Sequence, residues 1–320
     1  MLACSAKHIL IVGRASDFMD YISLGKTGER LSEIGLGTWK LGVDEKKEIE
    51  ALEYGLDSGI NFIDTAEMYG TEPLVAKAIR KSKDTFIATK VSPTHFRHDE
   101  VIRACEGSLQ RLGIKTIDLY QLHWPNKNVP IHETMGAMER LVDDGRIRHI
   151  GVSNFSIREL EEAQAALKKY EIVSDQIEYS MLVRDIGDEL LPFCKEECIS
   201  VIAYSPLSRA HIFEPKYAEL TKFLAGIGER HGKDVAQVAI NWLICKGNVI
   251  PIPKASSKKH VADLVGSAGW RLSKNEVSSI NDFLSDYSRR SLASVAKPAM
   301  NSHPFVTHAL TWLSSAGNKK

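Results

Sequence analysis

The sequence predicts a single-domain α/β protein folded as a (β/α)8, or TIM, barrel. From Glu33 onward, short apolar runs alternate with stretches in which apolar residues recur with helical spacing. The first pattern is typical of buried parallel strands and the second of amphipathic helices. Eight such pairs in roughly 250 residues fit a closed barrel better than an open doubly wound sheet, which remains the alternative. No glycine-rich dinucleotide fingerprint follows the first strand, because Lys40 stands where its third glycine would be.

The eight expected strands are short and apolar. They span residues 34–37, 61–63, 85–90, 117–122, 147–152, 173–176, 200–204 and 249–252. Helical periodicity is found near residues 46–58, 71–81, 99–112, 131–144, 156–168, 187–197, 217–230, 235–245 and 274–284. The helices near 217–230 and 235–245 belong to a longer insert between the seventh and eighth strands.

The two ends of the chain fit this pattern less well. Residues 1–18 match nothing downstream, and we expect an N-terminal extension or a start codon assigned too early, before Met19. The apolar run within residues 8–13 is too short for a membrane span and lacks the cleavage site of a secretory signal. The barrel is predicted over residues 19–285. Residues 286–320 form a C-terminal loop that docks on the barrel or, equally, a poorly ordered tail.

Composition excludes several classes of function. Lys plus Arg and Asp plus Glu both number 41, so no basic excess favours nucleic acid, and no apolar run favours a membrane. The five cysteines are few and scattered, which is typical of reduced thiols in a cytoplasmic protein. Cys194 and Cys198 lie four residues apart without a histidine or second cysteine pair nearby, so no metal site is expected.

Polar residues stand where the predicted strands end. The second strand leads to Asp64, the third to Lys90 and the fourth to His123. The later strands lead to Ser153 and Asn154, Gln176, Tyr204 and Lys254. In a barrel these residues converge on the rim at the carboxyl ends of the strands, where barrel enzymes carry their active sites.

Tyr69, in the loop five residues after Asp64, completes a set with Asp64, Lys90 and His123 that can donate a proton to a polarised carbonyl group. A phenol such as Tyr69 has an ordinary pKa of about 10, and we expect Lys90 beside it to lower that pKa. Asp64 would pair with Lys90, and His123 would donate a hydrogen bond to the carbonyl oxygen. Each residue alone has an ordinary structural explanation, but charges are rarely buried unless they are paired. Titratable groups with perturbed pKa values are concentrated at functional sites. The hydride must come from another molecule.

At these residues the chain resembles the aldo-keto reductase family, over about residues 19–285. The matching segments are Gly35–Trp39, Asp64–Gly70, Ala88–Lys90, Asp118–Pro125, Gly151–Phe155, Gln176–Tyr179, Ala203–Leu207 and Ile252–Lys254. The resemblance implies a (β/α)8 barrel that reduces aldehydes and ketones with NADPH, or less often NADH. It implies a catalytic tetrad of Asp64, Tyr69, Lys90 and His123.

The resemblance also implies a cofactor site and a substrate pocket. Contacts to the nicotinamide end are implied for Asp64, Ser153, Asn154, Gln176 and Tyr204, the last by stacking on the ring. Contacts to the ribose and pyrophosphate are implied for Thr38, Trp39, Ser205, Leu207 and Arg209. Contacts to the adenosine 2′-phosphate are implied for Lys254, Ser256 and Ser257. Trp39 and Trp124 would form the substrate wall beside Tyr69 and His123.

One position departs from the family pattern. Members specific for NADPH commonly carry an arginine six residues after the lysine that corresponds to Lys254, and this chain has His260 there. An imidazole is a weaker phosphate partner than a guanidinium, which binds with two hydrogen bonds. Lys258 and Lys259 can compensate, so we expect NADPH to be preferred and NADH to be possible.

Three functions are compatible with these residues. The leading one is an NAD(P)H-dependent oxidoreductase that reduces a small-molecule carbonyl compound, with Tyr69 as the proton donor. The second is a regulatory barrel of reductase-like fold that binds the nucleotide with little turnover. The third is a barrel hydrolase or isomerase that uses no nicotinamide. The physiological substrate and the oligomeric state do not follow from the sequence.

Overall fold

The computed structural model describes residues 19–82 and 84–294. The described residues belong to two units, one that extends to Ser278 and one that begins at Ser279. The expectations about residues 1–18, and about the part of the C-terminal segment after residue 294, lie outside the described residues.

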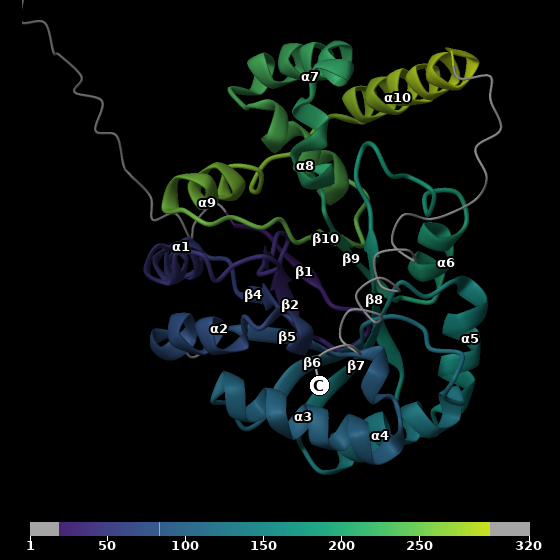
Figure 1. Cartoon of the computed structure of the whole chain (residues 1–320). Coiled ribbons are helices and arrows are strands. Elements are labelled where there is room, and N and C mark those ends of the chain that lie inside the picture. The colour runs from purple at the N-terminus through teal and green to yellow at the C-terminus, as the bar shows by residue number, and fades with distance from the viewer. Residues whose placement is uncertain (1–18, 83, 295–320) are drawn as a thin grey trace, which may run out of the picture. The chain divides into compact units, whose positions relative to one another are not determined.

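Eight parallel strands form one sheet, in which each strand pairs with its neighbours along the chain (Figure 1). They are β3 (Leu36–Gly37), β4 (Phe62–Asp64), β5 (Phe86–Val91), β6 (Ile117–Leu122), β7 (Ile147–Ser153), β8 (Ile172–Glu178), β9 (Ser200–Tyr204) and β10 (Val249–Pro251). All eight lie within two residues of their predicted bounds.

Backbone hydrogen bonds connect the first and last strands of this sheet. The amide of Gly35 donates to the carbonyl of Pro251 at 2.9 Å, and that of Gly37 donates to Pro253 at 3.0 Å. A Cβ atom at Gly37 would lie 2.7 Å from the Ile252 carbonyl oxygen, so the approach depends on glycine. The predicted (β/α)8 barrel is therefore confirmed, and the alternative of an open sheet is wrong.

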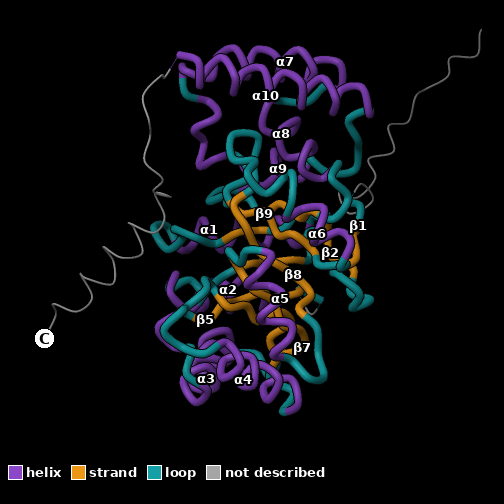
Figure 2. The backbone as a smooth tube through the Cα atoms, turned by 90° about the vertical axis from the view of Figure 1, so that its right-hand side faces the viewer, coloured by secondary structure: helices purple, strands orange, loops and turns teal. Residues whose placement is uncertain are grey.

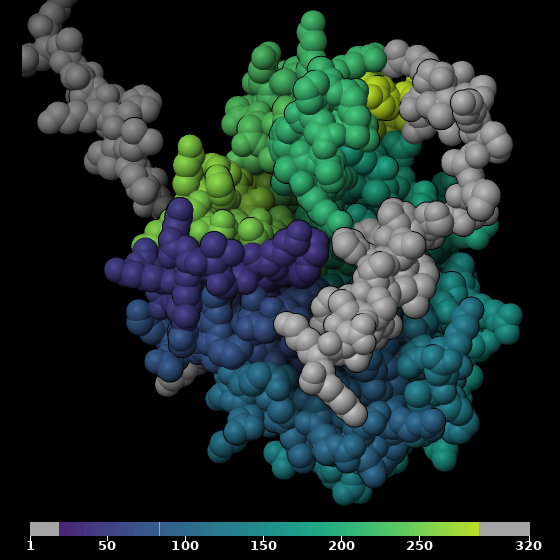
Figure 3. Space-filling view, in the orientation of Figure 1, coloured from purple at the N-terminus to yellow at the C-terminus, as the bar shows by residue number. Residues whose placement is uncertain are grey.

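Helices cover the outside of the strands (Figures 1 and 2). They are α1 (Glu45–Asp57), α2 (Glu72–Ala78), α3 (His98–Leu112), α4 (Ile131–Asp143), α5 (Ile157–Ala166), α6 (Leu190–Glu196), α7 (Ala218–His231), α8 (Val235–Ile244) and α9 (Lys258–Val265). The last helix of the described chain is α10 (Lys274–Ser294), most of which belongs to the second unit. Capping boxes begin α5 at Ser156 and α8 at Asp234, which explains these two boundaries. In the space-filling view α1 (purple) adjoins α9 (yellow-green), and the two helices are in contact (Figure 3).

Three elements differ from the prediction. Helix α9 was not expected, because its buried residues are Val261 and Leu264 alone, too few for a visible period. Helix α10 was expected to end near residue 284 and continues to Ser294 through a mostly polar stretch, so its last part carries no apolar stripe. Residues 279–294 of this helix belong to the second unit.

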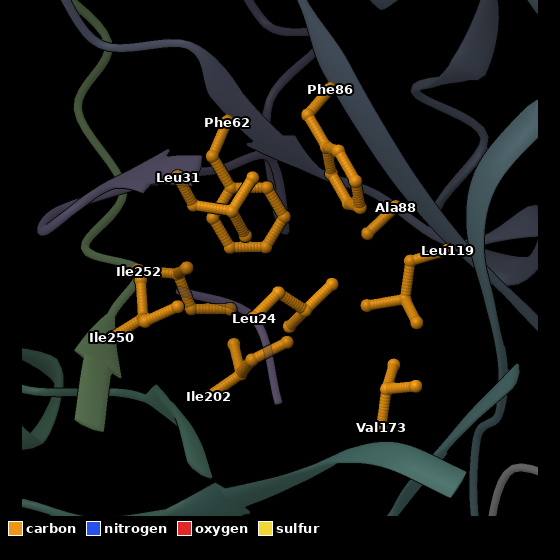
Figure 4. Close-up of a cluster of buried hydrophobic side chains, with 10 residues drawn as sticks. All are labelled: Leu24, Leu31, Phe62, Phe86, Ala88, Leu119, Val173, Ile202, Ile250 and Ile252. Atoms are coloured by element: carbon orange, nitrogen blue, oxygen red, sulfur yellow. The ribbon is translucent and has the colours of Figure 1, made fainter. Parts of the chain in front are cut away.

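The third element that differs from the prediction is an unexpected hairpin of β1 (Tyr21–Ser23) and β2 (Arg30–Ser32). Leu24 and Leu31 from this hairpin are buried among barrel side chains that include Phe62, Phe86 and Ile202 (Figure 4). The hairpin therefore fills the end of the barrel at which the strands begin. Its short strands carry too few apolar residues for an alternating pattern to be recognised in the sequence.

Candidate active site

A buried ion pair lies at the other end of the barrel. Lys90 in β5 is completely buried, and Asp64 at the end of β4 is 2% exposed. The Lys90 ammonium donates to Asp64 Oδ2 at 2.6 Å and to the backbone carbonyl of Thr65 at 2.7 Å. Removing two charges from water is costly unless they are paired with good geometry, which these contacts provide.

Tyr69 and His123 meet beside this pair. Tyr69 ends the 3₁₀ turn η2 (Glu67–Tyr69), and His123 directly follows β6. The Tyr69 hydroxyl lies 3.3 Å from His123 Nε2, and the two rings are edge to face with centroids 5.4 Å apart. The indole of Trp124 stacks on the His123 imidazole at 3.8 Å between centroids, which holds the imidazole plane. The structure thus brings the four predicted catalytic residues together.

The pKa of Tyr69 does not follow the prediction. Burial first, and then the charge of Asp64, raise this pKa well above its ordinary value. The Lys90 ammonium lies 5.0 Å from the centre of the Tyr69 ring, but both of its described hydrogen bonds go to Asp64 and Thr65. The Tyr69 pKa is therefore raised and not lowered as expected, because burial of the phenol is the largest influence on it and the Asp64 charge adds to the shift.

The other two titratable groups are also perturbed by burial. Burial lowers the pKa of Lys90, while the charge of Asp64 and the hydrogen bond to it oppose that shift. Burial, assisted by the Lys90 charge, lowers the pKa of His123 well below its ordinary value. The imidazole is therefore neutral at neutral pH, and it can serve as a hydrogen-bond donor without adding positive charge.

Two glutamine side chains complete the surroundings of Asp64. The amide of Gln176 donates to Asp64 Oδ1 at 2.7 Å, and that of Gln121 lies 3.4 Å from the same oxygen. Gln121 was missed because it lies within strand β6 rather than after it. Its signal is a polar residue in an apolar strand, in register with Lys90.

Three of the residues predicted to bind the nicotinamide form one hydrogen-bonded group. Asn154 donates to the hydroxyl of Ser153 at 2.9 Å and accepts from the Tyr204 hydroxyl at 2.9 Å. Asn154 has a φ of 62°, a left-handed backbone conformation that non-glycine residues rarely adopt. Such backbone strain is concentrated at functional sites.

The loop after β9 contains further non-glycine residues with a left-handed backbone conformation. Ser205, Ser208, Arg209 and Ala210 all have positive φ angles, between 50° and 69°. The guanidinium of Arg209 lies 5.0 Å from the centre of the Trp39 indole, which follows strand β3. Trp39 is 40% exposed, whereas Thr38 is fully buried and donates its hydroxyl hydrogen bond to the Asp64 carbonyl at 3.0 Å. Leu207 is half-buried in the same loop as Arg209.

The predicted 2′-phosphate residues follow β10. Lys254 and His260 are exposed, and Ser256 and Ser257 are half-buried. The Ser257 hydroxyl accepts from the His260 amide at 3.3 Å and thereby caps the N-terminus of α9. A cation, hydroxyl groups and a helix N-terminus are the chemistry that a phosphate requires, so these residues fit the group.

One buried acid beside the site was not predicted. Asp175 precedes Gln176 in β8 and therefore projects to the opposite side of the strand. Its side chain is fully buried, and none of the ion pairs in the described part of the chain involves it. Burial raises the pKa of Asp175 well above its ordinary value, although the backbone amides of Phe155 and Asn154 oppose the shift.

The described residues include neither a metal-binding cluster nor a membrane-spanning helix. Within residues 19–82 and 84–294, no cluster of histidine, cysteine, aspartate and glutamate could hold a metal ion. Within the same ranges, no helix has the length and apolar character that a membrane crossing requires.

Comparison with known proteins identifies the family. The model of the Aldo/keto reductase family matches residues 33–285. The chain belongs to this family. Aldo-keto reductase YhdN of Bacillus subtilis is 34% identical over 313 residues, with 83% of this chain and 94% of that protein covered. Methylglyoxal reductase YeaE of Escherichia coli is 34% identical over 258 residues, with coverages of 78% and 90%.

Solved structures of aldo-keto reductases have the same fold. The enzyme from Klebsiella pneumoniae in complex with NADPH is 33% identical, with a TM-score of 0.78 and coverages of 83% of this chain and 95% of that one. Membership of the family confirms the predicted class, an NADPH-dependent oxidoreductase that acts on carbonyl compounds.

Proposed function

We propose that this aldo-keto reductase reduces a small aldehyde or ketone to an alcohol, with Tyr69 as the proton donor. The observation that carries the proposal is the 3.3 Å separation of the Tyr69 hydroxyl and His123 Nε2 beside the buried Lys90–Asp64 pair. A carbonyl oxygen between the two groups would receive a hydrogen bond from each, which stabilises the developing negative charge. The relative named methylglyoxal reductase supports an aldehyde as the substrate.

The perturbed pKa values support these roles. A proton donor must hold its proton until the reaction, and burial raises the pKa of Tyr69 so that the phenol stays protonated at neutral pH. Proton transfer to the new alkoxide leaves a phenolate, and the Lys90 ammonium 5.0 Å from the ring centre stabilises that charge. The neutral His123 donates from Nε2 and orients the carbonyl oxygen without competing for the proton.

Bound NADPH would supply the hydride. We propose that Ser153, Asn154 and Gln176 hold the nicotinamide carboxamide, because Asn154 donates to Ser153, Ser153 donates to the Gln176 backbone carbonyl, and the Gln176 side chain contacts Asp64. Tyr204 would present its ring to the nicotinamide, and Arg209 would face the pyrophosphate. Thr38 would take part through Asp64 rather than by direct contact, since it is fully buried.

We propose the remaining cofactor and substrate contacts as the sequence predicted them. Lys254, Ser256 and Ser257 would bind the 2′-phosphate, with His260 beside them. Ser205 and Leu207 would line the pyrophosphate, and Trp39 and Trp124 would form the substrate wall. The exposure of the Trp39 indole supports this last role.

Turnover with both cofactors tests the proposed function. Oxidation of NADPH by a panel of small aldehydes and ketones is expected, with lower catalytic efficiency for NADH. Tight NADPH binding without turnover of any carbonyl compound would favour the regulatory barrel. A fluorescence titration without NADPH binding would favour a hydrolase or isomerase.

A further inference from the structure

Glu67 connects the turn that carries Tyr69 to the strand that carries Lys90. Glu67 stands two residues before Tyr69, and its side chain is 10% exposed. Its Oε1 atom accepts a hydrogen bond from the backbone amide of Ser92, two residues after Lys90, and lies 3.0 Å from His95 Nδ1. The carboxylate therefore joins the proton donor's turn to the segment that follows β5.

A second contact connects the same segment to the loop that carries His123. The side-chain amide of Asn126, three residues after His123, donates to the Pro93 carbonyl at 2.7 Å. Pro93 begins the 3₁₀ turn η4 (Pro93–His95), which Ser92 caps. Residues 92–95 therefore lie between the Tyr69 turn and the His123 loop and are bonded to both.

We infer that Glu67 and Asn126 are positioning residues, which set the separation of the Tyr69 hydroxyl and His123 Nε2 through residues 92–95. The inference rests on the proposed function and extends it to two residues that touch neither substrate nor cofactor. Turn η2 has three residues, so its own backbone bonds define its position weakly. A misplacement of about 1 Å at reacting groups can cost about a hundredfold in rate.

The hydrogen bond from the Ser92 amide to Glu67 positions the turn more strongly than the ion pair between Glu67 and His95 does. The His95 side chain is 49% exposed, and exposed ion pairs contribute little. The Ser92 amide is partly buried and would lose its partner without Glu67. Glu67→Gln keeps an oxygen acceptor for this amide, whereas Glu67→Ala removes it.

Single-turnover hydride transfer with saturating NADPH and an aldehyde tests the inference. Glu67→Ala and Asn126→Ala are expected to slow this step about tenfold to a hundredfold, while the Kd for NADPH changes less than about twofold. Glu67→Gln should retain most of the parent rate. In the double variant Glu67→Ala with Asn126→Ala, the fold-decrease in the rate should be smaller than the product of the two single decreases, because both contacts set the same separation of Tyr69 and His123. Asp99→Asn, which removes an exposed carboxylate next to His98, is the matched control and should leave the rate unchanged.

Several results would overturn the inference. One is a parent-like rate in Asn126→Ala, which decides the matter even if Glu67→Ala does not fold. Another is a Glu67→Gln rate as low as that of Glu67→Ala, and a third is a loss of NADPH affinity that parallels the loss of rate. The parent chain is measured first: absence of its turnover contradicts the proposed function, whereas normal turnover with unaltered variants contradicts the inference alone.

Discussion

At the scale of residues, the site depends on one charge pair that has no access to water. The Lys90 ammonium and the Asp64 carboxylate lie 2.6 Å apart, and Gln176 holds the second carboxylate oxygen. This pair keeps a cation close to Tyr69 while leaving little net charge in the barrel. Burial of the phenol raises the pKa of Tyr69, and the Lys90 ammonium lies 5.0 Å from the centre of its ring.

Lys90→Met tests the cost of this burial. The substitution leaves the Asp64 carboxylate buried without its cation, and breaking a buried pair costs about 3–5 kcal/mol of unfolding free energy. Urea unfolding measures the loss, and the double variant Asp64→Asn with Lys90→Met should recover part of it. A loss below about 1 kcal/mol in Lys90→Met would show that the pair behaves as if it were exposed.

His260→Arg tests the phosphate end of the proposed cofactor site. A guanidinium can form two charge-assisted hydrogen bonds with a phosphate, so the Kd for NADPH should fall by about threefold to tenfold, equivalent to roughly 1 kcal/mol. NADH lacks the 2′-phosphate, and its Kd should not change. Titration calorimetry with both cofactors measures the difference. An equal gain for NADH would separate His260 from the 2′-phosphate.

At the scale of elements, strand β8 serves the two sides of the barrel wall. Its alternation directs Gln176 to Asp64 inside and Asp175 to the helix layer outside. The charges nearest to Asp175 include Glu159 of α5, and its carboxyl also acts on the buried thiol of Cys194 in α6. Neither of these groups is a cation that would offset the effect of burial, which raises the pKa of Asp175.

Asp175→Asn should change the pH dependence of stability. Because the native pKa of Asp175 lies well above the unfolded value of about 3.9, the native state binds one more proton than the unfolded state between those two values. The parent's unfolding free energy therefore falls as pH rises through that window, by about 1.4 kcal/mol per pH unit. The variant lacks this contribution, so its stability relative to the parent should increase with pH. Urea unfolding from pH 5 upward, with the exposed Asp57→Asn as control, measures the difference, and a pH-independent difference would contradict it.

The elements differ in how far the sequence predicted them. The strands β3 to β10 were predictable because each is a short, mostly apolar run, and several of them end in or lead directly into a polar residue such as Asp64 or His123. The hairpin was not, since its burial arises from Leu24 and Leu31 entering a barrel that the remaining chain builds. Among the site residues, sequence position alone indicated Asp64, Lys90 and His123, whereas Gln121 and Glu67 depend on contacts across strands. The direction of the Tyr69 pKa also required the structure, because it depends first on how deeply the folded chain buries the phenol.

At the scale of the whole barrel, one end is filled with apolar side chains and the other carries the chemistry. Leu24 is fully buried in the cluster that Figure 4 shows, together with Phe62, Ile202 and Ile250. The hairpin thus closes one end of the barrel with packed apolar side chains. This packing excludes water from the barrel interior below the Lys90–Asp64 pair.

Leu24→Ala tests whether the hairpin stabilises the barrel. The truncation leaves a cavity among buried side chains, and substitutions of this kind cost about 2–5 kcal/mol. Val43→Ala is the control, because Val43 is 91% exposed and its truncation should change stability by less than about 0.5 kcal/mol. Thermal and urea unfolding measure both, and equal stabilities would show that the hairpin packs loosely.

The central claim is that the Tyr69 hydroxyl supplies the proton for carbonyl reduction, and single-turnover kinetics of Tyr69→Phe test it most directly. The variant keeps the ring and loses only the hydroxyl, so NADPH should bind with a Kd within about twofold of the parent value. Hydride transfer to a saturating aldehyde should be slower by about a hundredfold to ten-thousandfold, the usual contribution of a positioned general acid. An unchanged rate of hydride transfer in Tyr69→Phe would contradict the account.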